Sequence, residues 1–194
     1  MVDGIQARID EKRLGGRVIL RDLRLSVAPG EFVAVTGPSG CGKSTLLAIL
    51  AGLDPAFRGR VHAPGRLGVV FQEPRLLPWY SVARNIALAA PGLGPAAIES
   101  ALAAVGLPDA GPLLPGQLSL GMARRAALAR ALAVVPELLL LDEPFVSLDA
   151  ASADLVRTLV ARAWSTHRPT VVMVTHDLED AGRLAQRIIR LTPA

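Results

Sequence analysis

The stretch that decides the fold of this 194-residue chain is Gly37-Pro38-Ser39-Gly40-Cys41-Gly42-Lys43-Ser44-Thr45. A short apolar run, 32–35, comes before it, and a longer apolar segment, 43–51, comes after it. This order predicts a buried strand, a glycine-rich loop and a helix that stops at Gly52. Glycines let the backbone curl until successive N–H groups and the positive end of the helix face one point. The pattern is typical of a loop that holds phosphate groups.

Two side chains of this loop supply chemistry that backbone N–H groups lack. Lys43 carries a flexible point charge suited to the outer phosphates of a nucleotide, and the Ser44 hydroxyl is a ligand for Mg²⁺. Among the 21 basic residues only Lys12 and Lys43 are lysines. The chain otherwise uses arginine for positive charge, so a lysine at position 43 indicates a specific chemical role. Cys41 we interpret as a filler of the loop rather than as a catalyst.

Composition excludes several other classes of protein. A single cysteine leaves no disulfide framework and no multi-cysteine zinc site, which favours a reducing compartment. No apolar stretch approaches the roughly 18 residues of a membrane span, and the first residues lack the apolar core of a secretory signal. The net charge of +4 comes from scattered arginines, and only 4% of residues are aromatic, so we expect no nucleic-acid partner. We expect one cytoplasmic domain, residues 1–194.

Hydrophobic patterns outside the loop predict an α/β fold. Alternation over 5–9 and 23–27 predicts strands with one exposed face, hence an antiparallel β-subdomain. The fully apolar runs 138–141 and 170–174 predict strands of a mostly parallel sheet that helices cover on both sides. Apolar residues at i, i+4 spacing over 155–164, beginning with Leu155, predict a helix that lies on this sheet.

The middle of the chain, about 75–135, is expected to form a helical insertion. Its helical segments are 82–89, 95–105 and 119–134, and Pro/Gly-rich stretches separate them.

Polar residues follow the two apolar strands at the point where each one ends. Asp142 and Glu143 end the run 138–141, and His176 follows 170–174. Because the carboxyl ends of parallel strands meet at one edge of a sheet, we expect these side chains beside the phosphate loop. Asp142 can hold Mg²⁺, Glu143 can polarise an attacking water, and His176 can sense the terminal phosphate.

Taken together, these motifs resemble those of the ATP-binding cassette family, the ATPase subunits of ABC transporters, over residues 5–191. The phosphate loop is similar to the family's Walker A motif, and 138–144 to its Walker B motif with the catalytic glutamate. Gln72 stands at the place of the Q-loop glutamine, 147–149 at the D-loop and His176 at the switch histidine. The signature motif LSGGQ has its counterpart in Leu118-Ser119-Leu120-Gly121-Met122.

The resemblance implies a P-loop NTPase-like fold and a mechanism. Two cassettes, identical or different, would pair head to tail around two ATP molecules, and Ser119 and Gly121 would contact the nucleotide of the partner. Mg²⁺ would lie among Ser44, Gln72 and Asp142, and catalysis would use Lys43, Gln72, Glu143 and His176.

The same resemblance implies partners and a place in the cell. A membrane permease would dock near 73–80, where apolar residues lie in a loop that is expected either to dock or to pack on the insertion. A solute-binding protein is a further possible partner. The cassette would lie on the inner face of the plasma membrane. FQEPRLLPW, residues 71–79, is similar to the corresponding segment of importers for nitrate, sulfonate and taurine.

Departures from the family pattern affect the nucleotide site. Leu14 stands where an aromatic residue usually stacks on adenine, and Leu120 and Met122 replace Gly and Gln of the signature. These changes predict weaker nucleotide binding and a slow composite site.

Other classes of protein stay open at this point. A small-molecule kinase or GTPase is one, although Asn85 is the sole asparagine and the guanine-reading N-K-x-D motif is therefore absent. A non-transport ABC-type ATPase and a nucleotide-binding regulatory module without turnover are the others.

Overall fold

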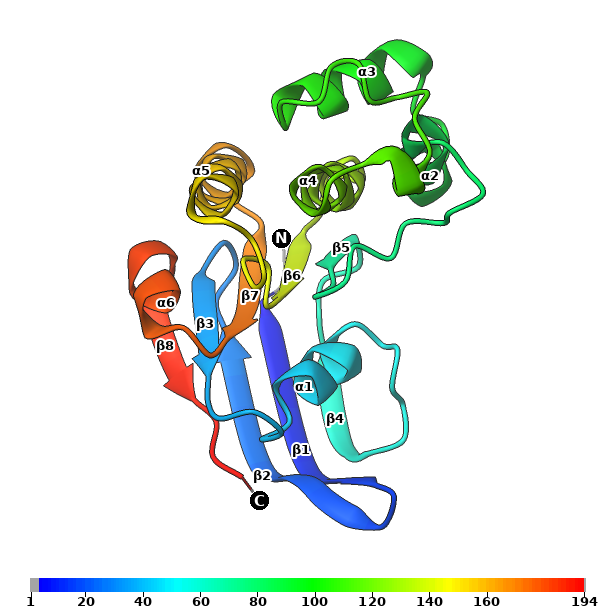
Figure 1. The fold of residues 1–194 in the computed structure, drawn as a ribbon. Helices are drawn as coiled ribbons and strands as arrows, with labels where there is room; N and C mark the ends of the chain where they lie inside the picture. Colours follow the sequence, from blue (N-terminus) through cyan, green and yellow to red (C-terminus); the bar gives the residue numbers. More distant parts are fainter. Residues whose placement is uncertain (1–3, 194) are drawn as a thin grey trace.

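The computed structural model describes residues 4–193. A five-stranded sheet forms its centre (Figure 1), with the strands in the order β5-β6-β7-β3-β8. The strand bounds are Leu67–Val70 for β5, Leu138–Asp142 for β6, Thr170–Thr175 for β7, Phe32–Thr36 for β3 and Arg187–Arg190 for β8. Neighbouring strands all run parallel, which confirms the predicted parallel sheet.

A second sheet is antiparallel and contains β1 (Ile5–Leu14), β2 (Arg17–Val27) and β4 (Arg58–His62), in the order β2-β1-β4. Ile5 and Ile9 of β1 are fully buried, whereas Gln6 and Arg8 are exposed. The alternation in the sequence therefore reports one buried and one solvated face, and the predicted antiparallel β-subdomain is confirmed.

Helices cover both faces of the parallel sheet. The shared core on one face contains α1 (Lys43–Leu50) and the antiparallel sheet. The core on the other face contains α4 (Leu120–Leu132), α5 (Ala150–His167) and α6 (Leu178–Leu184). Successive residues of a strand point to opposite faces, so Leu138 and Leu140 of β6 join the first core and Leu139 and Leu141 the second. Burial on both faces explains why this strand is apolar up to Asp142.

The helices expected in the middle of the chain are confirmed. α2 (Val82–Ala89) and α3 (Pro95–Ala104) lie at one end of the molecule, away from both sheets (Figure 1). With α4 they enclose a third hydrophobic cluster, and a short 3₁₀ helix, Pro115–Gln117, leads into α4. Since α4 contributes Ala126 to this cluster and Leu128 to the core under the sheet, it fastens the helical part to the rest of the fold.

The prediction for α5 was wrong at one position. Its buried stripe contains Ala153, Val156, Val160 and Ala163, whereas Leu155 is 41% exposed. Leu155 is one position, about 100° of helix rotation, away from Val156, which is enough to turn it out of the core. Within residues 4–193, no helix has both the length and the apolar composition that a membrane crossing requires.

Lys12 joins the antiparallel sheet to the segment that follows α1. Its side chain is buried, and its Nζ atom donates to Asp54 Oδ1 at 2.6 Å and to the Ala56 carbonyl at 2.9 Å. The hydrogen bond from Lys12 lowers the pKa of Asp54 below its ordinary value. The folded protein therefore favours the charged carboxylate, and this contribution to stability is present above the ordinary carboxyl pKa and disappears as the pH falls through the lowered value.

We expect Asp54→Ala to lower the free energy of unfolding by about 2–3 kcal/mol, because it leaves a buried ammonium group without its counter-ion. Lys12→Met is the matched variant and should change stability by less than about 1 kcal/mol, because the charge that needs compensation is then gone. Urea unfolding at neutral pH measures both changes. Equal losses in the two variants would contradict this account of Lys12.

Candidate active site

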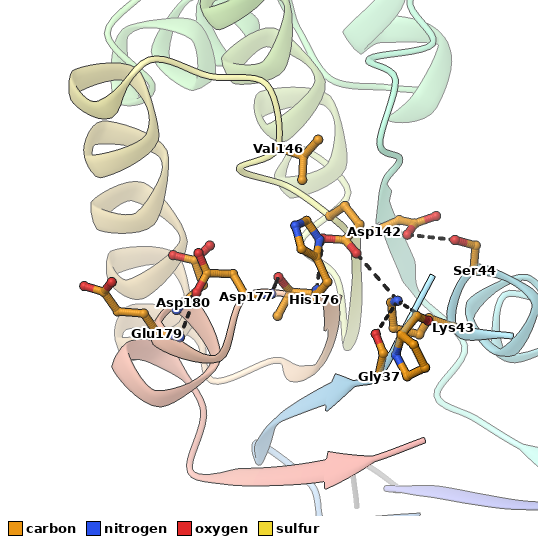
Figure 2. Close-up of polar contacts among 12 residues, drawn as sticks. Gly37, Lys43, Ser44, Asp142, Val146, His176, Asp177, Glu179 and Asp180 are labelled. Carbon is orange, nitrogen blue, oxygen red and sulfur yellow. Dashed lines mark hydrogen bonds and ion pairs between the residues drawn. The ribbon is translucent and has the colours of Figure 1, made fainter. Parts of the chain in front are cut away.

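The candidate site lies at the carboxyl edge of the parallel sheet, where three neighbouring strands end. β3 leads into the glycine-rich loop, β6 into Asp142 and Glu143, and β7 into His176. Because β6, β7 and β3 are adjacent in the sheet, residues about 100 positions apart meet there, as the sequence predicted. Figure 2 shows Lys43, Ser44, Asp142 and His176 gathered at this edge.

Backbone geometry in the loop requires glycine at two positions. A Cβ atom on Gly37 would overlap the Leu191 carbonyl oxygen and lie 2.8 Å from Cys41 Sγ. Gly42 has a φ of 100° at the N-cap of α1, and a Cβ there would lie 2.6 Å from Leu20 Cδ2. Cys41 is buried, in agreement with its interpretation as a filler. The loop is therefore packed closely against Leu191 at one position and against Leu20 of β2 at the other, and neither position has room for a Cβ atom.

Lys43, the first residue of α1, turns back over the loop. Its Nζ atom donates to the Gly37 carbonyl at 2.8 Å and to the Pro38 carbonyl at 3.1 Å. The same atom lies 3.9 Å from Glu143 Oε1, and only 8% of the residue is exposed. The ammonium group is thus held between the loop and the carboxylate by neutral acceptors, which a phosphate oxygen can replace.

Glu143 is held in an unusual conformation. Its φ of 45° lies in the left-handed region, which strains a residue other than glycine by about 1–3 kcal/mol. Its Oε2 atom accepts from the His176 backbone N–H at 3.3 Å and lies 3.0 Å from His176 Nδ1. The carboxylate is therefore fixed between a histidine and a lysine, a geometry suited to accepting a proton from water.

Asp142 and Ser44 form the part of the site that suits a divalent cation. The Ser44 hydroxyl donates to Asp142 Oδ1 at 3.1 Å. Burial raises the pKa of Asp142, and the hydrogen bond from Ser44 opposes this shift. A desolvated carboxylate beside a hydroxyl is an oxygen donor set that fits Mg²⁺, which keeps few protein ligands and takes others from phosphate and water.

A cleft of about 490 Å³ opens beside these groups, and Ser44 lines it whereas Asp142 does not. It contains most of the predicted site residues, together with others from β1 and β2, and its lining consists of Leu14, Ile19, Ser39, Gly40, Gly42, Lys43, Ser44, Thr45, Gln72, Glu143, Val146 and His176. Leu14 and Ile19 form its apolar end. The phosphate-binding loop residues and the apolar end together give the cleft the chemistry of a nucleotide site.

Ser119 and Gly121 lie at the start of α4 and are not part of this lining. Ser119 caps the helix, since its hydroxyl oxygen accepts from the Met122 N–H at 3.2 Å. Leu120 is 45% exposed. The start of α4 therefore lies outside the lining of the chain's own cleft.

The loop 73–80 was expected either to dock a partner or to pack on the helical insertion, and its residues differ in this respect. Leu76 packs against the helical cluster, whereas Trp79 is 69% exposed. Buried Asn85 fixes the loop from α2, because its side chain accepts from the Leu77 N–H and donates to the carbonyls of Leu77 and Tyr80. Packing thus accounts for Leu76 but not for Trp79.

Sequence reasoning missed three residues of the site. Ile19 and Val146 line the cleft, and buried Arg124 of α4 donates to the carbonyls of Glu143 and Val146. Burial lowers the pKa of Arg124. A cation within the alanine-rich segment 119–134 was the available signal for Arg124, whereas Ile19 and Val146 are ordinary apolar residues without one.

Comparisons with known proteins agree with this geometry. A family model described as ABC transporter matches residues 20–146. The chain is 49% identical to the aliphatic sulfonates import ATP-binding protein SsuB 2 of Burkholderia cenocepacia, with 97% of this chain and 74% of that protein covered. It is 50% identical to SsuB 3 of Nocardia farcinica, with 96% and 76% covered.

Solved structures give the same result. A dimeric, post-hydrolysis ATP-binding cassette with bound ADP and phosphate superimposes with a TM-score of 0.85 and 29% identity, over 97% of this chain and 94% of the other. The dimeric structure of a bacterial ABC transporter cassette gives a TM-score of 0.84 and 30% identity, over 96% and 94%.

The fold and the site thus define a P-loop NTPase of the cassette type. The chain belongs to the ABC transporter family as an ATP-binding subunit. It is an ATPase that energises an ABC transporter.

We expect Leu14→Tyr to tighten ATP binding about tenfold, because an aromatic ring at the apolar end of the cleft can stack on the base. The matched control is Leu53→Tyr, since Leu53 is similarly exposed, 61% against 64% for Leu14, but does not line the cleft. Titration with a fluorescent ATP analogue measures both dissociation constants. An unchanged constant for Leu14→Tyr would show that the base does not reach this residue.

Proposed function

We propose that the chain powers an importer of small organic anions of the aliphatic sulfonate type. The observation that supports ATP hydrolysis is the position of the Glu143 carboxylate. It lies between Lys43 and His176 and lines a nucleotide-sized cleft. The substrate class is supported by the sulfonate importers with 49% and 50% identity and by the segment 71–79.

In the proposed reaction, Glu143 accepts the proton of the attacking water, and Lys43 and His176 stabilise charge on the terminal phosphate. The N–H groups of the glycine-rich loop bind the remaining phosphates, and Leu14 and Ile19 contact the base. Ser44, Asp142 and Gln72 would hold Mg²⁺, which when bound supplies a positive charge that neutralises the phosphates.

We assign Ser119 and Gly121 to the nucleotide of a second cassette. Three observations support this assignment: both residues lie outside their own cleft, Ser119 caps the start of α4, and the related solved cassettes are dimers. A helix start offers free N–H groups that suit a phosphate. Identical or different cassettes fit this geometry equally well.

The exposed loop 73–80 is our candidate surface for the membrane permease. Trp79 is exposed on a loop that Asn85 and Arg130 hold rigid, Arg130 through the carbonyls of Pro74 and Arg75. A rigid apolar contact of this kind suits a protein partner. The cassette would then lie on the cytoplasmic face of the membrane, and a solute-binding protein would deliver the anion from the other side.

Reconstitution tests this function. The cassette and its permease, purified together from native membranes, are placed in liposomes with ATP, and uptake of a radiolabelled alkanesulfonate is measured. ATP-dependent uptake supports the proposal. Phosphate release without uptake of any organic anion would favour the non-transport ATPase, and nucleotide binding without phosphate release would favour the regulatory module.

A further inference from the structure

Arg124 is a buried cation without a carboxylate partner in the described part of the chain. Only 4% of the residue is exposed. Its Nη2 atom donates to the Val146 carbonyl at 2.9 Å and its Nη1 atom to the Glu143 carbonyl at 3.3 Å. Over residues 4–193, its Nε atom is the one buried side-chain nitrogen or oxygen that lacks a hydrogen-bond partner. An apolar side chain would fill such a position more favourably, so the arginine is best explained by what it holds.

The two carbonyls that it holds belong to the turn that carries the proposed catalytic base. Glu143 begins this turn with a φ of 45°, and Ser147, just after Val146, has a φ of 62°. Glu143, Val146 and His176 line the same cleft, and Figure 2 labels Val146 and His176 in one view of the site. The guanidinium fork spans the turn from Glu143 to Val146, a reach that a planar group with several donors allows.

We propose that Arg124 is a positioning residue for ATP hydrolysis. It fixes the backbone of Glu143 in the left-handed conformation that directs the carboxylate towards His176 and Lys43. Arg124 itself is not part of the cleft lining, so its replacement should change nucleotide affinity little. This inference rests on the proposed role of Glu143 as the base.

A purely structural role for Arg124 would be to anchor α4. Arg125, the next residue of the same helix, provides the matched comparison, because its Nη1 atom donates to the carbonyls of Val105 and Gly106 at 3.0 and 2.8 Å. It thus makes the same kind of contact to main-chain oxygens, but within the helical part of the fold and away from Glu143.

The experiment measures kcat, KM and Kd for ATP and the melting temperature of Arg124→Met, Arg124→Lys and Arg125→Met. We expect Arg124→Met to lower kcat about 10- to 100-fold, the size of effect that a small misplacement of a catalytic group produces, with the Kd for ATP unchanged within about twofold. Arg124→Lys should fall between wild type and Arg124→Met, because an ammonium group cannot span both carbonyls. Arg125→Met should lower the melting temperature and leave kcat unchanged.

A double-mutant cycle shows whether Arg124 acts through Glu143. In a Glu143→Gln background, Arg124→Met should change the residual rate by less than about twofold, because the group that it positions is gone. An equal loss in both backgrounds would overturn the proposal. So would a kcat for Arg124→Met within about twofold of wild type together with a melting temperature as low as that of Arg125→Met.

The remaining outcomes are also decisive. If Arg124→Met does not fold, Arg124→Lys decides: a wild-type kcat overturns the proposal, and a lowered kcat with an unchanged Kd supports it. Failure of the underlying function is distinguishable, because it would appear as retained hydrolysis in the Glu143→Gln single variant, whatever Arg124 does.

Discussion

Glu143→Gln is expected to bind ATP with nearly wild-type affinity and to lose about 10²- to 10⁴-fold in the rate of phosphate release. The amide keeps the shape of the side chain and an oxygen that can accept from the His176 N–H, which lies 3.3 Å from Oε2 in the wild type. It cannot accept a proton from water. Single-turnover phosphate release and an equilibrium titration with ATP measure the two quantities separately.

The control for this variant is Glu137→Gln. Glu137 precedes the other end of β6 and pairs with Arg66 at 3.2 Å, so the same chemical change is made far from the cleft. Its rate should stay within about twofold of wild type. Hydrolysis at the wild-type rate in Glu143→Gln would remove this residue from the role of base.

Lys43→Met is expected to weaken ATP binding about 100-fold or more, because phosphate oxygens then enter a buried site without their counter-charge. Methionine has a similar helix propensity and length, so α1 should persist. Isothermal titration calorimetry with ATP and with ADP measures the loss, which should be larger for ATP because the ammonium group faces the outer phosphates.

Lys12→Met separates this effect from the general loss of a buried lysine. Lys12, on the antiparallel sheet, is as inaccessible as Lys43 but donates to Asp54 and to the Ala56 carbonyl in the segment that follows α1. Its variant should bind ATP as the wild type does. Equal affinity of the Lys43 and Lys12 variants would show that Lys43 makes no direct contact with the nucleotide.

Local signals were sufficient to predict most of the fold and the loops of the site. The apolar runs of β6 and β7 are long enough to require burial on both faces, and a turn or polar residue marks where each strand ends. The gathering of these strand ends at one edge of the sheet then follows from the rule that ligands bind at the carboxyl ends of parallel strands. For this reason the sequence alone predicts that Lys43, Asp142, Glu143 and His176 lie in one site. The order of the strands comes from the structure.

Features that depend on tertiary packing could not be predicted in this way. Leu155 fits the helical period of α5 but faces solvent, because helix rotation relative to the sheet is fixed by neighbouring side chains. The left-handed conformation of Glu143 has no signature in residue type. The hydrogen bond from Arg124 to the carbonyl of Glu143 joins segments about 20 residues apart, and only the packing of α4 brings them together.

Burial of both lysines makes the chain unusual in its response to chemical labelling. Lys12 is 3% exposed and Lys43 is 8% exposed, and the chain contains no other lysine. Bulky amine-reactive esters and lysine-specific proteases need an accessible lysine side chain, and the folded chain offers them none. Acylation of the Lys12 peptide, followed by mass spectrometry, would therefore count molecules that have opened the antiparallel sheet. The native protein thus carries its own reporter of local opening, and no foreign dye has to be attached.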